Sequence, residues 1–183
     1  MKTHNLAFID LEMTGLLLEK HEIIEVGCIV ARQVPQNSGG ARLEVIEEIE
    51  MKVRPEHIET ADPRGLEING YNPENWKNAI SLTEALTALS EKTKGAIMVA
   101  HNGAFDSAFL EQGFEKTAVK NQMHYHQLDT IPIAFAKLYA VPGVQKFSLK
   151  ELCAYYGIEN KKAHTALSDA RATYELYRKL MGI

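Results

Sequence analysis

The sequence has 183 residues, of which 45% are hydrophobic and 24% charged, and its formal net charge is -4. These values are typical of a single folded domain over residues 1–183 and exclude a disordered chain. The charge gives no overall basic bias towards nucleic acid, but an enzyme that holds its substrate through metal ions and a local patch does not need one.

The first strands are expected to form an antiparallel meander. Asn5–Leu11 is apolar, Ile23–Ala31 is rich in β-branched residues, and Leu43–Val53 alternates between apolar and polar residues. The connections are short, and the QNSGG segment at Gln36–Gly40 is interpreted as a turn between two strands. Consecutive strands with short connections pair in antiparallel fashion.

Helical signals follow. Pro63–Asn69 and Pro73–Ala79 are expected to form short helical turns. Ser81–Lys92 is predicted to be a helix, because Ser81 and Glu84 have the spacing of a capping box, in which each side chain bonds the other residue's backbone N–H.

In the second half, strands alternate with helices, which favours parallel pairing through crossovers. The sum is an α/β fold with a mixed five-stranded sheet flanked by helices. The predicted elements are strands at Ala96–Ala100 and Tyr125–Leu128, and helices at Ala104–Phe114, from Asp129 or Thr130, at Ser148–Tyr156 and at Thr165–Leu180.

Two further features of the sequence indicate the cellular compartment of the protein. The N-terminal MKTHNLAFIDLEM soon includes acidic residues and has no cleavage-site pattern, which argues against a secretory signal, and no apolar run approaches the length of a membrane span. Cys28 and Cys153 lie far apart, each in an apolar stretch, so buried free thiols are expected instead of a disulfide. We therefore predict a cytoplasmic protein without membrane contact.

Two acids stand at the end of the first strand. Asp10 and Glu12 are separated by one residue, so they point to the same face of a strand, about 6–7 Å apart. No Lys or Arg is adjacent to them, and a hard cation such as Mg²⁺ would compensate their repulsion. Exposure of both acids to solvent is the alternative. Thr14 and Gly15 turn the chain sharply and are expected to leave backbone N–H groups available to a ligand.

A third acid lies in the segment HNGAFDSAFL. Asp106 falls in the first turn of a helix, where the helix dipole favours a negative charge, and this alone can explain it. Asn102 can be explained in the same way as a helix cap. Phe105 and Phe109 are four residues apart and are expected to pack in the core rather than stack on bases.

The last helix carries a fourth acid. Asp169 stands beside Ala166 and Ala170, and such small neighbours would let the helix approach the sheet and bring Asp169 towards the strand acids. His164 is placed at the helix entrance. Taken alone, this histidine is better explained as an exposed loop residue beside Lys161 and Lys162.

Together, the segments FIDLEMTGL, HNGAFDSAFL and AHTALSDARATYELYRKL resemble the three motifs of the DEDDh exonucleases, in order and over nearly the whole chain. That family includes the proofreading subunit of bacterial replicative polymerase, ribonuclease T and oligoribonuclease. The resemblance implies a ribonuclease H-like fold and a 3′–5′ exonuclease that releases nucleoside 5′-monophosphates. It further implies metal ligands at Asp10, Glu12, Asp106 and Asp169, a general base at His164, and nucleotide contacts at Met13, Thr14, Leu16 and, in support, Asn102.

The implied chemistry uses two Mg²⁺ or Mn²⁺ ions about 3.5–4 Å apart around the scissile phosphate. Asp10 would bridge both ions, Glu12 and Asp169 would complete the shell of the ion that carries the attacking water, and Asp106 would hold the other. His164 would take the proton of that water, since imidazole exchanges protons near neutral pH.

Several alternatives stay open. The first motif is close to that of oligoribonuclease and the second to the proofreading and ribonuclease T groups, so short RNA, structured RNA 3′ ends and single-stranded DNA are all candidate substrates. A homodimer, association with a polymerase and an inactive binding domain are further options. The apolar run at Leu16–Leu18 suits a wedge against bases or a partner surface. Phosphate contact is one interpretation of Lys146, Lys150, Lys161 and Lys162, but a solvated basic surface explains them better. The pair His124 and His126 lacks the further ligands of a zinc site.

Overall fold

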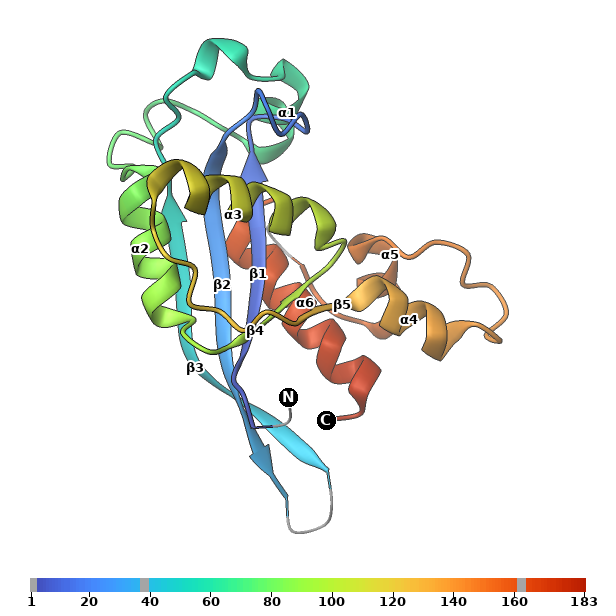
Figure 1. The fold of residues 1–183 in the computed structure, drawn as a ribbon. Coiled ribbons are helices and arrows are strands. Elements are labelled where there is room, and N and C mark those ends of the chain that lie inside the picture. Colours follow the sequence, from blue (N-terminus) through green and yellow to red (C-terminus); the bar gives the residue numbers. More distant parts are fainter. Residues whose placement is uncertain (1–2, 37–39, 161–163) are drawn as a thin grey trace.

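The computed structural model describes residues 3–36, 40–160 and 164–183 and contains a five-stranded sheet in the order β3-β2-β1-β4-β5 (Figure 1). Strands β1, β2 and β3 pair in antiparallel fashion, whereas β4 is parallel to β1 and β5 is parallel to β4. The predicted mixed sheet is confirmed. Its strands are β1 (Leu6–Met13), β2 (Ile23–Pro35), β3 (Ala41–Lys52), β4 (Ile97–Ala100) and β5 (Gln127–Asp129).

Helices cover both faces of this sheet. Helices α2 and α3 lie across one face and α6 across the other, while α4 and α5 project beside the β5 edge and α1 lies beyond the strand ends (Figure 1). The helices are α1 (Pro63–Asn69), α2 (Leu82–Lys92), α3 (Ala104–Thr117), α4 (Thr130–Leu138), α5 (Leu149–Tyr156) and α6 (Ala166–Met181), with a 3-10 turn at Ile58–Thr60. The capping box predicted for α2 is present at Ser81 and Glu84.

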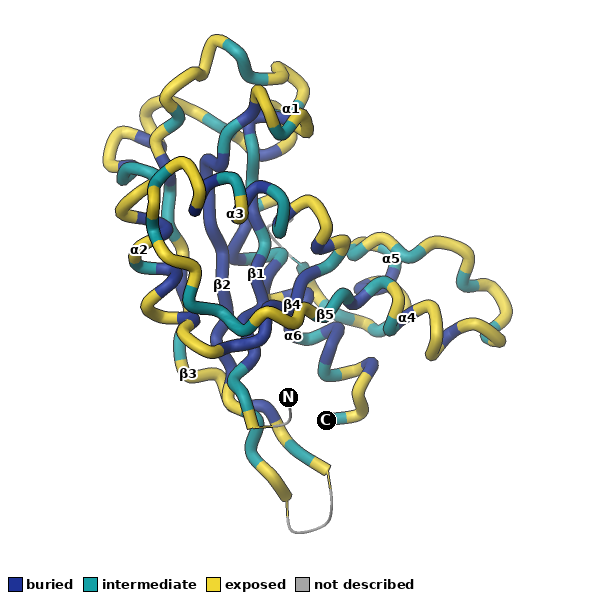
Figure 2. The backbone as a smooth tube through the Cα atoms, in the orientation of Figure 1, coloured by how far each residue is buried: buried dark blue, intermediate teal, exposed yellow. Residues whose placement is uncertain are grey.

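The alternation of side chains along β1 decides which face receives the acids. Ala7, Ile9 and Leu11 pack under α2 and α3. Phe8 packs on the opposite face, where its ring lies edge-on to two tyrosines of α6, with centroid distances of 5.2 and 5.4 Å. The strand period of two therefore places Asp10 on the α6 side. Figure 2 shows that most of β1, the first nine residues of β2 and all of β4 are buried.

Some expected boundaries were wrong. The fifth strand begins at Gln127 instead of Tyr125, because His124, Tyr125 and His126 stack on one another and only three residues pair with β4. By contrast, Pro73–Ala79 forms hydrogen-bonded turns, as expected, in which the Trp76 N–H donates to the carbonyl oxygen of Asn72 at 3.1 Å. The tip of the QNSGG turn, residues 37–39, lies outside the described residues, although the strands that it joins are paired.

Two further predictions concern location and thiols. Among the described helices, none combines the length and apolar character needed to cross a membrane. Cys28 and Cys153 are both buried and both free thiols, as expected.

Candidate active site

Three carboxylates from two elements meet on the α6 face of the sheet. Asp10 and Glu12 come from β1 and Asp169 from the first turn of α6, and one oxygen of each lies within 4.8 Å of the others. All three are half-buried. This confirms that the strand acids share a face and that Asp169 approaches them. The spacing of the oxygens suits a shared cation.

Helix α6 reaches the acids because β2 has no side chain where the helix crosses it. Gly27 is paired with Asp10 in the sheet, and a Cβ at Gly27 would lie only 2.1 Å from the carbonyl carbon of Ala166. Next to it, the buried Glu25 carboxylate accepts the Ala166 N–H at 3.1 Å and so satisfies one of the free donors at the helix start. Gly27 and Glu25 thus fix where α6 begins, and therefore where Asp169 lies.

Gly27→Ala is expected to disrupt the candidate metal site. The added methyl cannot fit against the Ala166 backbone, so α6 must move, at a cost of about 1–3 kcal/mol. The measurement is the rise in melting temperature produced by Mg²⁺, which should shrink or vanish. Gly113→Ala is the matched control, because its Cβ would come closest to the Leu86 side chain, at 2.9 Å, in the core on the face of the sheet opposite to α6. An unchanged Mg²⁺ response in Gly27→Ala would contradict this account.

Asp106 enters the site from α3 at the neighbouring edge of β1. Strand β4 pairs with β1 only as far as Phe8, so the Leu11 N–H lacks a strand partner on that side. The Asp106 carboxylate accepts that N–H at 3.0 Å. Its position therefore has a structural cause in addition to the helix dipole. It is not one of the three acids whose oxygens lie within mutual reach.

His164 lies at the entrance of α6, as predicted. Its side chain is exposed, its φ is 70°, and its N–H donates to the Asp169 carboxylate at 3.1 Å. The other Asp169 oxygen accepts from the amide of Asn160, whose own oxygen accepts from the Ser168 hydroxyl at 2.7 Å. Asn160 orients Asp169, and no pattern in the sequence marked it.

Burial and mutual repulsion disfavour the ionised form of these carboxylates. Burial, reinforced by the neighbouring carboxylates, raises the pKa of Glu12 to about 8 and holds the pKa of Asp10 well above its ordinary range. Burial also raises the pKa of Asp106 to about 7, although its hydrogen bond from Leu11 works against this. Among the described residues, no Lys or Arg forms an ion pair with these acids. A divalent cation is the missing charge that would stabilise them.

The acids open into a cleft of about 710 Å³. Three of the four residues expected to contact a nucleotide, Met13, Leu16 and Asn102, line it, and so does His164. Phe105 lines it too, with 43% of its surface exposed, so the expectation that Phe105 packs in the core was wrong. Phe109, four residues later on the same side of α3, lies in the core, whereas Phe105 is in the first turn of the helix, at the rim of the cleft. Sequence reasoning also missed His101, Ile131, Phe147 and Leu149 in the lining.

Thr14 is the exception among these four residues. It is fully buried, its N–H donates to the Glu22 carbonyl at 2.8 Å, and its hydroxyl accepts the Glu22 N–H at 2.9 Å. The expectation that this turn leaves the Thr14 N–H available was therefore wrong. Gly15 is required because a Cβ there would lie 2.3 Å from the His21 ring. The turn presents Leu16, 67% exposed, at the mouth of the cleft.

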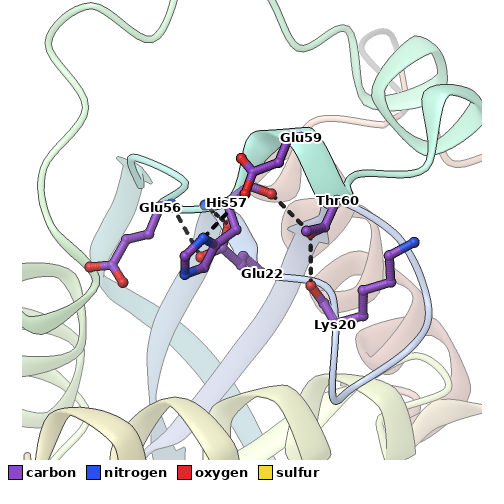
Figure 3. A network of polar contacts seen from close by, with 6 residues as sticks. All are labelled: Lys20, Glu22, Glu56, His57, Glu59 and Thr60. Atoms are coloured by element: carbon purple, nitrogen blue, oxygen red, sulfur yellow. Dashed lines mark hydrogen bonds and ion pairs between the residues drawn. The ribbon is translucent and has the colours of Figure 1, made fainter.

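A network of polar contacts braces this turn from outside (Figure 3). The Glu22 carboxylate accepts the N–H groups of Glu56 and His57 at 3.1 and 2.8 Å. The Thr60 hydroxyl donates to the Lys20 carbonyl at 3.0 Å. The segment that leads from β3 to α1 is thereby tied to the turn that follows β1, which keeps Leu16 in place relative to the acids.

Asn102 is not a helix cap, because α3 begins after Gly103 without a side-chain cap. Its backbone has a φ of 66°, which asparagine tolerates better than most residues. Asp129 supports this conformation, since its carboxylate accepts the N–H groups of Asn102 and Gly103 at 3.2 and 2.9 Å. Asp129 also caps α4, because its carboxylate accepts the Ile131 N–H.

The chain is similar in sequence to several known proteins. A family model described as "Exonuclease" (RNase_T) matches residues 7–177. The epsilon subunit of DNA polymerase III from Escherichia coli K12 is 28% identical over 186 residues, which cover 95% of this chain and 70% of that protein. A PolC-type DNA polymerase III from Oceanobacillus iheyensis is 27% identical over 172 residues, which are 94% of this chain but only 11% of the polymerase.

Solved structures share the fold at lower identity. Exonuclease I of E. coli in complex with a dT13 oligonucleotide superposes with a TM-score of 0.73 at 16% identity, over 97% of this chain and 41% of that one. The ribonuclease H-like fold expected from the motifs is confirmed. The chain thus spans less than half of this exonuclease and about a tenth of the PolC-type polymerase.

Proposed function

The chain belongs to the exonuclease family of ribonuclease T and the DNA polymerase III epsilon subunit, and on that premise we propose that it is a metal-dependent 3′–5′ exonuclease. It releases nucleoside 5′-monophosphates one at a time from the 3′ end of single-stranded DNA or RNA. The observation that carries the proposal is the group of three carboxylates whose oxygens lie within 4.8 Å of one another at the base of an open cleft.

The acids fit divalent cations by their own chemistry. Asp10, Glu12 and Asp169 offer only oxygen donors, which Mg²⁺ and Mn²⁺ prefer, and burial leaves their charges uncompensated. Asp106 would hold the second ion from the α3 side, through the carboxylate oxygen that does not accept the Leu11 N–H. When bound, two such ions would activate water and stabilise the charge of the leaving oxygen.

The protein's own groups orient the substrate and move the proton. His164 stands at the rim of the cleft, where its exposed imidazole takes the proton of the attacking water. The His164 N–H and the Asn160 amide hold Asp169 in one orientation. Gly27 and Glu25 keep these groups at a fixed distance from β1.

Apolar walls receive the terminal nucleotide. Met13 and Leu16 bound the cleft on the β1 side and Phe105 on the α3 side, so the last base lies between apolar surfaces while its phosphate faces the acids. Thr14 acts by shaping the turn that presents Leu16, and Asn102 contributes the opposite rim. Apolar contact and stacking are tolerant of base identity, which suits an enzyme that removes every nucleotide in turn.

Stability should depend on pH and metal together. The folded-state pKa values of Asp10, Glu12 and Asp106 lie above their unfolded values, so their contribution is full at acid pH and is lost as pH rises towards about 7 and 8. Without metal, the melting temperature should therefore fall between pH 5.5 and 8.5 as these groups ionise. Saturating Mg²⁺ should restore it, by about 5–10 °C at a hundredfold excess over Kd. A Mg²⁺ effect equal at both pH values would contradict the cluster's role.

Digestion of 5′-labelled oligonucleotides tests the function itself. Single-stranded DNA and RNA of the same sequence, and dinucleotides of each, are incubated with Mg²⁺ or with EDTA. We expect a ladder that shortens by one nucleotide from the 3′ end, nucleoside 5′-monophosphate as the product, and no reaction in EDTA. Internal cuts would contradict the proposal. Tight binding without cleavage would instead indicate an inactive nucleic-acid-binding domain.

The purified protein can also be tested for binding partners. The relatives include a subunit and a PolC-type form of DNA polymerase III, so association with a polymerase is part of the proposal, as is a homodimer. Light scattering during chromatography, with and without a DNA polymerase, distinguishes the two. Activity of the isolated chain would show that no polymerase is required, and activity of a fraction that light scattering shows to be monomeric would show that no dimer is required.

A further inference from the structure

A row of three aromatic side chains, two of them exposed, runs from the cleft along α4. Phe147 lines the cleft, its ring centroid is 5.6 Å from that of Phe135, and Phe135 is 5.4 Å from Tyr139. Phe135 is 50% exposed and Tyr139 77%. We call Phe147, Phe135 and Tyr139 the aromatic track. From Ile131, another lining residue, α4 carries the track about 12 Å away at about 1.5 Å per residue.

The folded core does not explain the exposed part of this row. Helix α4 buries a different side, on which Ala134 and Leu138 pack against Leu176 and Leu180 of α6. Phe135 and Tyr139 stand one turn apart on the side that this packing leaves in solvent. Large rings exposed in succession beside a cleft are typical of a binding surface.

The charge around the track favours a polyanion. Residues 130–157 contain three lysines and one glutamate, a formal charge of +2, in a chain whose total is -4. Lys137 and Lys150 are exposed, and Lys146 lies 4.0 Å from its nearest partner, Glu151. This positive region of an otherwise acidic chain adjoins the cleft on the side where the track begins.

We propose that the aromatic track stacks the bases of the nucleotides that precede the terminal one, with the lysines of the region near their phosphates. This deepens the proposed function, on which it rests, by defining the substrate. Bases are free to stack on protein rings only when they are unpaired, so the strand must be single over the track. Two exposed rings, Phe135 and Tyr139, hold two bases, so a strand of three or more nucleotides binds better than a dinucleotide.

The test compares two substrates that differ in whether they reach the track. One is a 5′-labelled strand of twelve thymidines, and the other is the p-nitrophenyl ester of thymidine 5′-monophosphate, which fills only the cleft. In the variant Phe135→Ala/Tyr139→Ala, kcat/KM for the strand should fall at least about 30-fold, since one stacked base contributes a factor of about 5 or more. Most of the loss should lie in KM, and the ester should be hydrolysed at the wild-type rate.

Tyr125→Ala is the matched control. Tyr125 is 84% exposed but precedes β5, at the end of the sheet away from the acids, and should change neither substrate. Equal losses on strand and ester, or no loss on the strand, would overturn the proposal. If the track variant turns a dimer into a monomer and the strand still binds with the wild-type Kd, the track is a self-association surface and the proposal is wrong.

A binding measurement separates this proposal from the proposed function. Fluorescence anisotropy of the labelled strand gives Kd in an Asp10→Asn background, where turnover cannot consume the probe. A Kd at least about 30-fold weaker in the track variant supports the track even if the wild-type protein cleaves nothing, in which case the exonuclease proposal alone fails. An unchanged Kd alongside normal cleavage by the wild type refutes the track alone.

Discussion

Asp10→Asn is expected to abolish cleavage, with kcat reduced by about 10⁴-fold or more. An oxygen of Asp10 lies within 4.8 Å of those of Glu12 and Asp169, and Asp10 also interacts electrostatically with Asp106, so it is the acid proposed to bind both ions. The same substitution should raise the melting temperature of the metal-free protein at pH 8. It replaces a half-buried carboxylate, whose charge is destabilised by desolvation and by Asp106, Asp169 and Glu12, with a neutral amide of the same shape. A variant that is more stable than the wild type but inactive would show that Asp10 serves catalysis and not folding.

The two halves of this expectation are measured separately. Single-turnover cleavage of a labelled strand gives the rate, and thermal melting in EDTA gives the stability. Glu115→Gln, an exposed acid on α3, is the control and should alter neither. A melting curve that collapses in Asp10→Asn would make Asp10 a structural residue, and cleavage near the wild-type rate would remove it from the active site.

His164→Ala should lower kcat by about 10²–10⁴-fold while the Mg²⁺-induced rise in melting temperature persists. The imidazole is exposed at the rim and is not one of the clustered ligands, so its loss removes a proton acceptor and not a cation site.

The backbone at His164 calls for a second variant. Its φ of 70° is strained for alanine, and its N–H bonds Asp169, so a change in backbone could mimic the loss of a base. His164→Asn tolerates this conformation and keeps the N–H in place. Both variants should be slow. A nearly normal rate in His164→Asn, or loss of the Mg²⁺ response in either variant, would assign His164 to positioning Asp169.

Local patterns made much of this arrangement predictable. The spacing of Asp10 and Glu12 determines that they share a face once a strand forms, and small residues around Asp169 indicate a helix that sits close to the sheet. The capping box at Ser81 marks the start of α2. Each of these features depends on side chains a few residues apart, which helix and strand periods bring together.

The rest depends on contacts between distant segments. Glu25 bonds a residue 141 positions later, and Asp106 bonds one 95 positions earlier, so nothing near either residue indicates its partner. The exposure of Phe105 was missed because its helical spacing to Phe109 suggests a shared core face, whereas α3 begins at the rim of the cleft. Thr14 was expected to offer a free N–H, which in fact donates to the carbonyl of Glu22, the residue before β2.

The aromatic track was not foreseen for a similar reason. Phe135 and Tyr139 have the spacing of a buried helical stripe, and only the position of α6 shows that α4 packs through Ala134 and Leu138 instead. A sequence period gives the faces of a helix, but the neighbouring elements decide which face is covered.

Crystals of the protein soaked in Mn²⁺ and measured at the manganese absorption edge would locate the cations directly. We expect anomalous peaks between the carboxylates of Asp10, Glu12 and Asp169, with a second ion about 3.5–4 Å away on the Asp106 side. Manganese found only elsewhere, with the fold and these side chains intact, would contradict the proposal that the four acids form a metal-dependent active site.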